Sequence, residues 1–218
     1  YSVKKASHII TISNSSKNDI LKEYGVAAEK VSVVYPGIKQ VTTLTPHIYG
    51  MNELKTKYSI SGNYLLSVGT LQPRKNTARL IEAFAQVKHS KEYKDSDLEL
   101  VVVGKKGWLY EEILAAPEKF DVKDSVKFLD FVADEDLELL YKDAVCYVLP
   151  SLYEGFGLPV LEAMKYDCPV ITSNSSSLPE AAGDAALYVD PTETDDIVKK
   201  IRSLLDDNTL RQALIKKG

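Results

Sequence analysis

The fold is decided by Ser151-Leu-Tyr-Glu-Gly-Phe-Gly-Leu-Pro-Val-Leu-Glu-Ala-Met-Lys165, which follows an apolar run from Ala144 to Leu149. The run is typical of a buried strand, and Gly155 and Gly157 then free the backbone for a tight loop. Pro159 marks the first turn of a helix, where its missing amide hydrogen is tolerated. The stretch therefore predicts a strand, a loop and a helix N-terminus whose backbone amides are placed to bind an anion.

The same alternation extends outward over most of the chain. Apolar strands alternate with amphipathic helices, the pattern of a parallel sheet covered on both faces. The sequence thus predicts an α/β fold, with a Rossmann-like parallel sheet and helices on both of its faces. The six strand candidates are Tyr64–Val68, Leu98–Val103, Val126–Leu129, Val145–Leu149, Pro169–Thr172 and Ala186–Val189.

The first part of the chain is shorter than a domain. His8–Ile12 and Val31–Tyr35 are strand candidates, and a helix capped by Ser13 or Ser15 ends between them at Gly25. This part is too short to hold a core of its own. It has the form of the last elements of a preceding domain.

The division into domains follows from the next segment. Residues 38–50 are rich in Thr and show no periodicity, which is typical of a linker. We expect residues 1–50 to form the tail of an amino-terminal domain plus this linker, and residues 51–218 to form the main domain. One amphipathic helix or a pair of helices over Thr194–Lys217 ends the chain.

The composition excludes several classes of protein. A net charge of −4 and a pI near 5.5 argue against a general nucleic-acid or membrane-surface binder, which needs a basic field. No apolar run approaches the roughly 18 residues of a membrane span, and the first residues lack a signal pattern. Cys146 and Cys168 are expected to be small buried hydrophobes. We expect a cytoplasmic protein, or one held peripherally at the inner face of the membrane.

Parallel strands end at one edge of their sheet, so loops that are distant in sequence meet there. The loop Gly69–Asn76 carries Arg74 and Lys75 just before a helix, where basic residues are disfavoured unless they have an anionic partner. We expect these two cations to hold a diphosphate without a metal. Lys105 and Lys106 follow another strand, and they fit this edge and plain solvent exposure equally well.

Glu154 and Glu162 lie on either side of the free amides. Paired carboxylates serve as acid and base in glycosidases, but neither residue is expected in apolar surroundings that would raise its pKa. We expect both to accept hydrogen bonds from sugar hydroxyls. The apolar neighbours of Glu162 predict a helix that is buried nearly all round. No metal site is expected, because the Asp-x-Asp sequences at 95–97 and 134–136 fit capping better.

The order of these motifs resembles that of the retaining family-four glycosyltransferases, enzymes of the two-domain GT-B fold. Glu154-Gly-Phe-Gly-Leu-Pro-Val-Leu-Glu162 is similar to their Glu-x7-Glu motif. Gly69-Thr-Leu-Gln-Pro-Arg-Lys-Asn76 resembles the phosphate-binding loop of a bacterial subgroup rich in mannosyltransferases. Further matches at Val103–Trp108, Phe128–Val132 and Ser177–Gly183 extend the resemblance over nearly the whole chain. Together the motifs are highly specific, whereas each alone is weak.

The resemblance implies a role for each matching residue. The implied reaction transfers a hexose from a nucleotide sugar with retention of configuration, without a metal or other cofactor, and with electrostatic stabilisation of the leaving diphosphate. Arg74 and Lys75 would bind that diphosphate, Glu154 would contact the transferred sugar, and Glu162 would hold the ribose hydroxyls. The remaining implied contacts are backbone amides of Phe156, Gly157 and Leu158, the segment Phe131 and Val132 along the base, and Gly104 where the nucleotide approaches closely.

The resemblance also implies the donor-binding half of such an enzyme. Family members have an amino-terminal acceptor domain of similar size, and residues 1–25 match only its last strand and helix. We expect GDP-mannose or a UDP-sugar as donor, a saccharide or lipid-linked acceptor held through the missing domain, and no nucleic-acid partner. The alternatives are a non-catalytic nucleotide-sugar-binding module, one subunit of a split enzyme, and an epimerase or phosphorylase of the same architecture.

Overall fold

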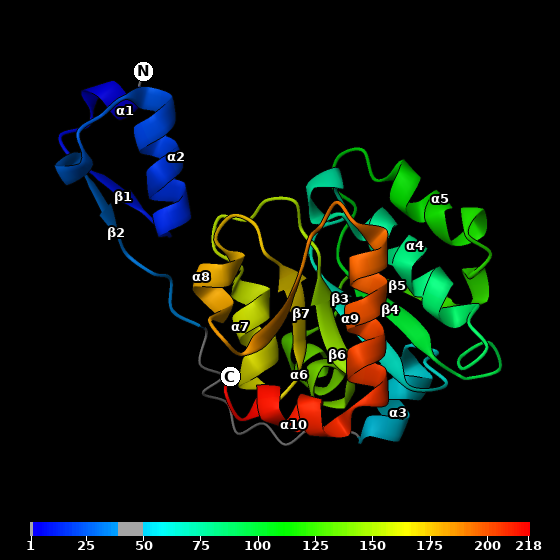
Figure 1. Ribbon diagram of the computed structural model, residues 1–218. Helices are drawn as coiled ribbons and strands as arrows, with labels where there is room; N and C mark the ends of the chain where they lie inside the picture. Colours follow the sequence, from blue (N-terminus) through cyan, green and yellow to red (C-terminus); the bar gives the residue numbers. More distant parts are fainter. Residues whose placement is uncertain (1, 39–49) are drawn as a thin grey trace.

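The computed structural model describes residues 2–38 and 50–218. The first of these parts, which we call the N-terminal unit, contains two short parallel strands with Ile9 opposite Val31. Figure 1 shows it in blue beside the larger α/β body. Its elements are α1 (Ser2–Lys5), β1 (Ile9–Thr11), α2 (Asn14–Tyr24), the 3-10 helix η1 (Ala28–Lys30) and β2 (Val31–Val33).

Helix α2 begins and ends where its sequence predicts. The Ser13 side chain accepts a hydrogen bond from the amide of Ser16, which satisfies one of the free amides of the first turn. Gly25 adopts the left-handed conformation at φ 59° and closes the helix with a bond from its amide to the Leu21 carbonyl.

The main sheet has six parallel strands in the order β5-β4-β3-β6-β7-β8, which confirms the predicted fold class. The chain runs outward in one direction from β3 to β5 and in the other direction from β6 to β8. The contact between β3 and β6 is therefore the topological switch point, where open α/β sheets bind their ligands. The strands are β3 (Tyr64–Val68), β4 (Glu99–Val103), β5 (Val126–Leu129), β6 (Cys146–Leu149), β7 (Val170–Ser173) and β8 (Ala186–Val189).

Helices cover both faces of this sheet, as Figure 1 shows. Successive side chains of a strand point to opposite faces, so Leu65 and Leu66 of β3 join different core clusters. The cluster of Leu65 includes α4 (Thr77–Lys88), α5 (Glu111–Lys119), α9 (Thr194–Asp206) and α10 (Asn208–Ile215). The cluster of Leu66 includes α3 (Met51–Lys57), α6 (Asp134–Asp143), α7 (Leu158–Lys165) and α8 (Leu178–Ala182).

Of two expectations about helices, the one for α7 is confirmed and the one for Asp136 is wrong. In α7, Val160 and Ala163 are buried, Glu162 and the other residues are half-buried, and Lys165 alone is exposed. Asp136 does not cap α6. Its buried carboxylate instead accepts hydrogen bonds from Lys57 and Tyr58, which lie at the end of α3.

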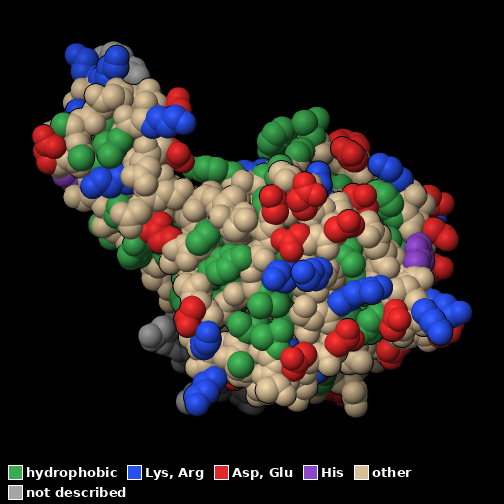
Figure 2. All heavy atoms as spheres, viewed as in Figure 1, with side chains coloured by type: hydrophobic (Ala, Val, Ile, Leu, Met, Phe, Trp, Pro, Cys, Tyr) green, Lys and Arg blue, Asp and Glu red, His purple; other side chains and the backbone are tan. Residues whose placement is uncertain are grey.

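The structure also bears on the cysteines, on the surface charge and on the expected linker. Cys146 and Cys168 are buried free thiols, and burial raises the pKa of Cys146 to about 12. Within the parts that the structure describes, no helix has the length and apolar character that crossing a membrane requires. Basic and acidic side chains are interspersed over the face seen in Figure 2. Most of the linker expected at 38–50 falls outside the described residues.

Candidate functional site

The charged residues singled out in the sequence meet at the switch point. The 3-10 helix η2 (Pro73–Lys75), which follows β3, presents Arg74 and Lys75 to the loop that follows β6. Arg74 Nη1 lies 2.7 Å from Glu154 Oε2, and Lys75 Nζ lies 2.6 Å from Glu154 Oε1. The backbone joins the same two loops, because the Leu152 amide donates to the Arg74 carbonyl. One carboxylate thus holds two cations at the edge where the strands end.

Three serine side chains hold Glu154 in place by hydrogen bonds. Ser151 Oγ donates to Glu154 Oε1 over 2.8 Å and is itself fully buried. The segment after β7 holds the backbone: Ser176 Oγ accepts from the Glu154 amide, and Ser177 Oγ donates to the Glu154 carbonyl. Both peptide groups and one carboxylate oxygen of Glu154 are therefore held by hydroxyl groups, which gives this side chain a defined position.

The electrostatic surroundings keep Glu154 charged. Burial alone would raise the pKa of its carboxyl, but attraction to Lys75 and hydrogen bonds from Lys75, Arg74 and Ser151 lower it below the ordinary value. The group is accordingly a carboxylate at neutral pH. It is suited to accept hydrogen bonds or to balance cations, and unsuited to act as a general acid.

Backbone amides lie free beside this cluster. Gly157 adopts φ 102° and precedes α7, and a Cβ atom at this position would lie 2.7 Å from Leu178 Cδ2. A side chain is therefore excluded there on two grounds. Within residues 2–38 and 50–218, the amides of Phe156, Gly157 and Leu158 donate no hydrogen bond. They retain the capacity to bind an anion at the helix N-terminus.

Glu162 lies apart from the Glu154 cluster. It borders a groove of about 70 Å³ between α6 and α7, which is also lined by Asp134 and Tyr166. The Tyr141 hydroxyl is 3.4 Å from Glu162 Oε2. Burial raises the pKa of Glu162, and nearby Asp134 adds to this effect. The expectation that neither glutamate has a raised pKa is therefore wrong for Glu162, because burial outweighs the hydrogen bond from Tyr141 and the attraction to Lys165.

The positions predicted to lie along the base and the nucleotide differ in their exposure. Phe131 is 71% exposed, and Lys105 Nζ lies 5.5 Å from the centre of its ring. Val132 is buried in the core, so its side chain is not available to a ligand. A Cβ atom on Gly104 would lie 2.0 Å from the Gly69 carbonyl oxygen. Glycine at this position is therefore required by the contact between two neighbouring loops.

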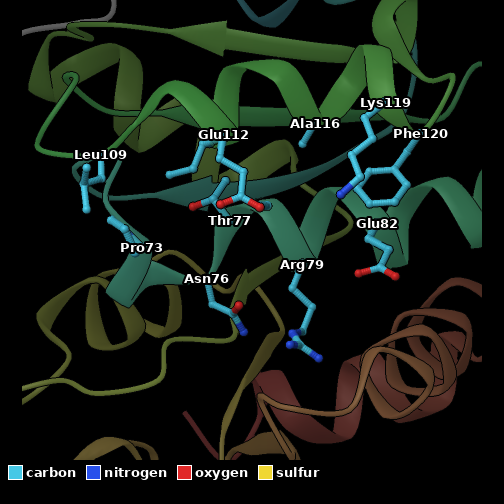
Figure 3. A pocket seen from close by; sticks show the side chains of 12 residues that line it. Pro73, Asn76, Thr77, Arg79, Glu82, Leu109, Glu112, Ala116, Lys119 and Phe120 are labelled. Carbon is cyan, nitrogen blue, oxygen red and sulfur yellow. The ribbon is translucent and has the colours of Figure 1, made fainter.

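The structure also contains a cavity that borders the loop of the two cations, because Pro73 and Asn76 line it. About 220 Å³ in volume, it lies between α4 and α5 and is lined by Arg79, Glu82, Glu112 and Lys119 among others (Figure 3). Neither Glu154 nor the two cations that it holds line this cavity. Within the described residues, no group of three or more His, Cys, Asp or Glu side chains is arranged to bind a metal ion.

The sequence reasoning missed the serines that hold Glu154. Ser151 and the run Ser175–Ser177 carry a signal in the sequence, since four hydroxyl side chains follow two adjacent strands. Ser151 binds the Glu154 carboxylate from three positions away, whereas Ser176 and Ser177 bind the Glu154 backbone from more than 20 positions away. Only the pairing of β6 with β7 brings the two segments together.

A parallel sheet with cations, a carboxylate and free amides at its switch point is the arrangement with which open α/β proteins hold anionic ligands at their strand ends. The family is shown by comparison of the sequence. A family model described as "Glycosyl transferases group 1" matches residues 52–218. The chain belongs to this family and contains its glycosyltransferase domain, in agreement with the resemblance of the motifs.

Individual relatives and solved structures agree with this assignment. The chain is 32% identical over 218 residues to O-antigen chain mannosyltransferase B of Escherichia coli, covering 100% of the chain and 56% of the relative. It is 33% identical to O-antigen chain mannosyltransferase RfbU of Salmonella typhimurium, covering 94% and 54%. The structure of WaaG, a glycosyltransferase involved in lipopolysaccharide biosynthesis, matches 95% of the chain and 56% of its own length with a TM-score of 0.78 and 25% identity. The chain thus spans about half the length of the relatives that it matches.

Proposed function

We propose that this chain binds the donor in a retaining hexosyltransferase, which transfers mannose from a nucleoside diphosphate sugar. The observation that carries the proposal is the cluster of Glu154 with Arg74 and Lys75 at the switch point of the sheet. A diphosphate leaving group develops negative charge as the bond to the sugar breaks. Two fixed cations and a helix N-terminus stabilise that charge without a metal ion.

The proposed roles follow the surroundings of each residue. Arg74 and Lys75 bind the diphosphate together with the amides of residues 156–158, which have no partner among the described residues. Glu154 is held charged beside them and accepts hydrogen bonds from the transferred sugar. In its separate groove, the Glu162 carboxylate accepts hydrogen bonds from the ribose hydroxyls. Phe131 and the backbone of Val132 line the base, and Gly104 shapes the loop beneath it.

The domain division is part of this proposal. We place the donor-binding domain at residues 51–218 and assign residues 1–50 to the amino-terminal domain and the linker. The first-named relatives are nearly twice as long as the matched region, which supports an acceptor site formed by further protein. The acceptor that we propose is a saccharide or a lipid-linked saccharide, reached in the cytoplasm or at the inner face of the membrane. Mannose is proposed because the two relatives are named mannosyltransferases.

Calorimetry with GDP and UDP tests the site. Arg74→Ala and Lys75→Ala should each weaken nucleoside diphosphate binding about ten-fold or more, because each removes a charge-assisted contact of roughly 1.5 to 3 kcal/mol. Arg211→Ala is the matched control, since Arg211 lines a cavity beside Ala144 and Pro169, at the opposite end of the strands. If both site variants bind GDP and UDP as tightly as the wild type, the assignment of Arg74 and Lys75 to the diphosphate is refuted.

Two further measurements test the sugar and the reaction. A thermal-shift panel of GDP-mannose, UDP-glucose and their free nucleotides should give the largest shift with GDP-mannose. Transfer is then measured with the donor, an acceptor saccharide and the amino-terminal half of a relative supplied in trans. Tight donor binding without transfer to an acceptor that the relative uses would favour a non-catalytic nucleotide-sugar-binding module.

A further inference from the structure

The N-terminal unit contacts the Glu154 loop at three points. The Tyr153 hydroxyl donates to Asp19 over 2.6 Å. Ser16 Oγ donates to the Gly155 carbonyl at 3.4 Å. The Tyr35 ring stacks on Phe156 with 5.5 Å between the ring centres. The loop that carries Glu154 and the free amides is therefore held on its outer side by residues that come more than 100 positions earlier in the chain.

A single carboxylate ties the same unit to α8. Glu180 accepts hydrogen bonds from the amide and side chain of Asn14, at 2.6 to 2.9 Å, and from the Ser15 amide at 3.3 Å. The Tyr35 hydroxyl also donates to it, over 2.7 Å. The negative charge of Glu180 lies at the N-terminus of α2, where free amides and the helix dipole favour an anion. We call Asn14, Tyr35 and Glu180 the joint.

The joint is connected to Glu154 along two short routes. Glu180 belongs to the first turn of α8, and the residues just before α8 include Ser176 and Ser177, which bind the two peptide groups of Glu154. Tyr35 provides the second route, because its hydroxyl binds Glu180 while its ring covers Phe156. A shift of the N-terminal unit therefore moves both supports of the Glu154 loop together.

We propose that Tyr35 and Glu180 are positioning residues that set the place of the Glu154 loop according to the placement of the N-terminal unit. This inference rests on the proposed function for its effect on the sugar. The charge needed for it is present at neutral pH: burial opposes the charged form of Glu180, but hydrogen bonds from Tyr35, Asn14 and Ser15 lower its pKa below the ordinary value. The hydrogen bond to Glu180 in turn raises the pKa of Tyr35, so that its hydroxyl stays a donor.

The consequence for binding is selective. Arg74 and Lys75 come from η2, and among the described residues Tyr35 and Glu180 make no contact with them. Weakening the joint should therefore leave the part of the diphosphate affinity that these two cations supply, and reduce only the part that the amides of residues 156–158 supply. The contact between Glu154 and the sugar should suffer more, because it depends on where the loop lies.

The test uses Tyr35→Phe, which keeps the ring on Phe156 and removes the hydroxyl, and Glu180→Gln, which removes the charge with little change of shape. Matched controls on the same unit are Tyr24→Phe and Glu29→Gln, two exposed residues. Dissociation constants are measured for GDP and GDP-mannose, and again for UDP and UDP-glucose. Each joint variant should weaken sugar-nucleotide binding about three- to ten-fold, and free-nucleotide binding by a clearly smaller factor.

A measurement without ligand keeps this test separate from that of the function. Amide hydrogen exchange in residues 152–157 should become faster in both joint variants and stay unchanged in the controls. If exchange in this loop does not change, the joint does not position it, whether or not the protein binds a nucleotide. Equal weakening of free and sugar nucleotides would also overturn the proposal. A wild-type chain that binds neither nucleotide would overturn the proposed function, while the exchange result would still decide on the joint.

Discussion

Replacing Glu154 by Gln should strengthen the binding of a free nucleoside diphosphate. In the structure, the Glu154 carboxylate already occupies the two cations that the diphosphate is expected to use. A bound diphosphate must share or displace it. Gln removes the negative charge and keeps the shape of the side chain, so that Arg74 and Lys75 become available to the ligand alone.

The size of the effect follows from the burial of the cations. The Lys75 side chain is only 12% exposed, and leaving one partner of a buried ion pair without its counter-charge costs about 3 to 5 kcal/mol. The Arg74 side chain is 36% exposed, so water compensates for much of the interaction that Arg74 loses when the Glu154 charge is removed. A diphosphate restores the missing charge and recovers part of this free energy. If about 1.4 to 3 kcal/mol is recovered, affinity rises roughly ten- to a hundred-fold.

Calorimetry with GDP and UDP at pH 7.5 measures this change, and thermal unfolding without ligand should show a lower midpoint for Glu154→Gln. Glu162→Gln is the control, because Glu162 has no cation on the diphosphate loop and its loss should weaken binding. Sugar transfer should fall in both variants. If folded Glu154→Gln binds the free nucleoside diphosphate no more tightly than the wild type, the reasoning about shared cations is refuted.

Two other predictions concern Glu162 and Gly104. Because the pKa of Glu162 is raised, its carboxylate takes up a proton at a higher pH than an ordinary glutamate, so GDP affinity should fall as the pH is lowered from 8 toward 5. Glu162→Gln should bind more weakly at pH 8 and show a flatter profile, and equal profiles would refute the assignment. Gly104→Ala should cost about 2 to 4 kcal/mol of unfolding free energy in urea, since its Cβ meets the Gly69 carbonyl at a positive φ. Gly37→Ala, with open space around it, should change the unfolding free energy by less than about 0.5 kcal/mol.

The sheet and the meeting of its loops were predictable from the sequence. The apolar runs fall within one residue of the six strands of the main sheet, since the strands of a parallel sheet are covered on both faces and are mostly apolar. Right-handed connections between such strands bring their carboxyl ends to one edge. That argument alone brings Arg74, Lys75 and Glu154 to the same place.

The contacts within the site were not predictable in the same way. Periodicity indicates which face of an element is buried, but it does not indicate which of several loop side chains meet. The cations therefore turned out to hold Glu154 itself, and Glu162 turned out to lie in a separate groove. Phe131 and Val132 are neighbours in sequence, yet one is exposed and the other is part of the core. Such differences depend on packing between elements far apart in the chain.

The order of the strands has a consequence for how the site forms during folding. The stretch from β3 to β5 carries Arg74 and Lys75, whereas the stretch from β6 to β8 carries Glu154, so neither half of the sheet holds both partners of these ion pairs. The ion pair joins residues 80 positions apart, and closing so long a loop slows its formation. On the proposed function, a nucleoside diphosphate would use the two cations and the amides of residues 156–158, and would therefore bind tightly only to chains in which β3 and β6 have paired. Such a ligand stabilises completed molecules selectively over half-folded ones.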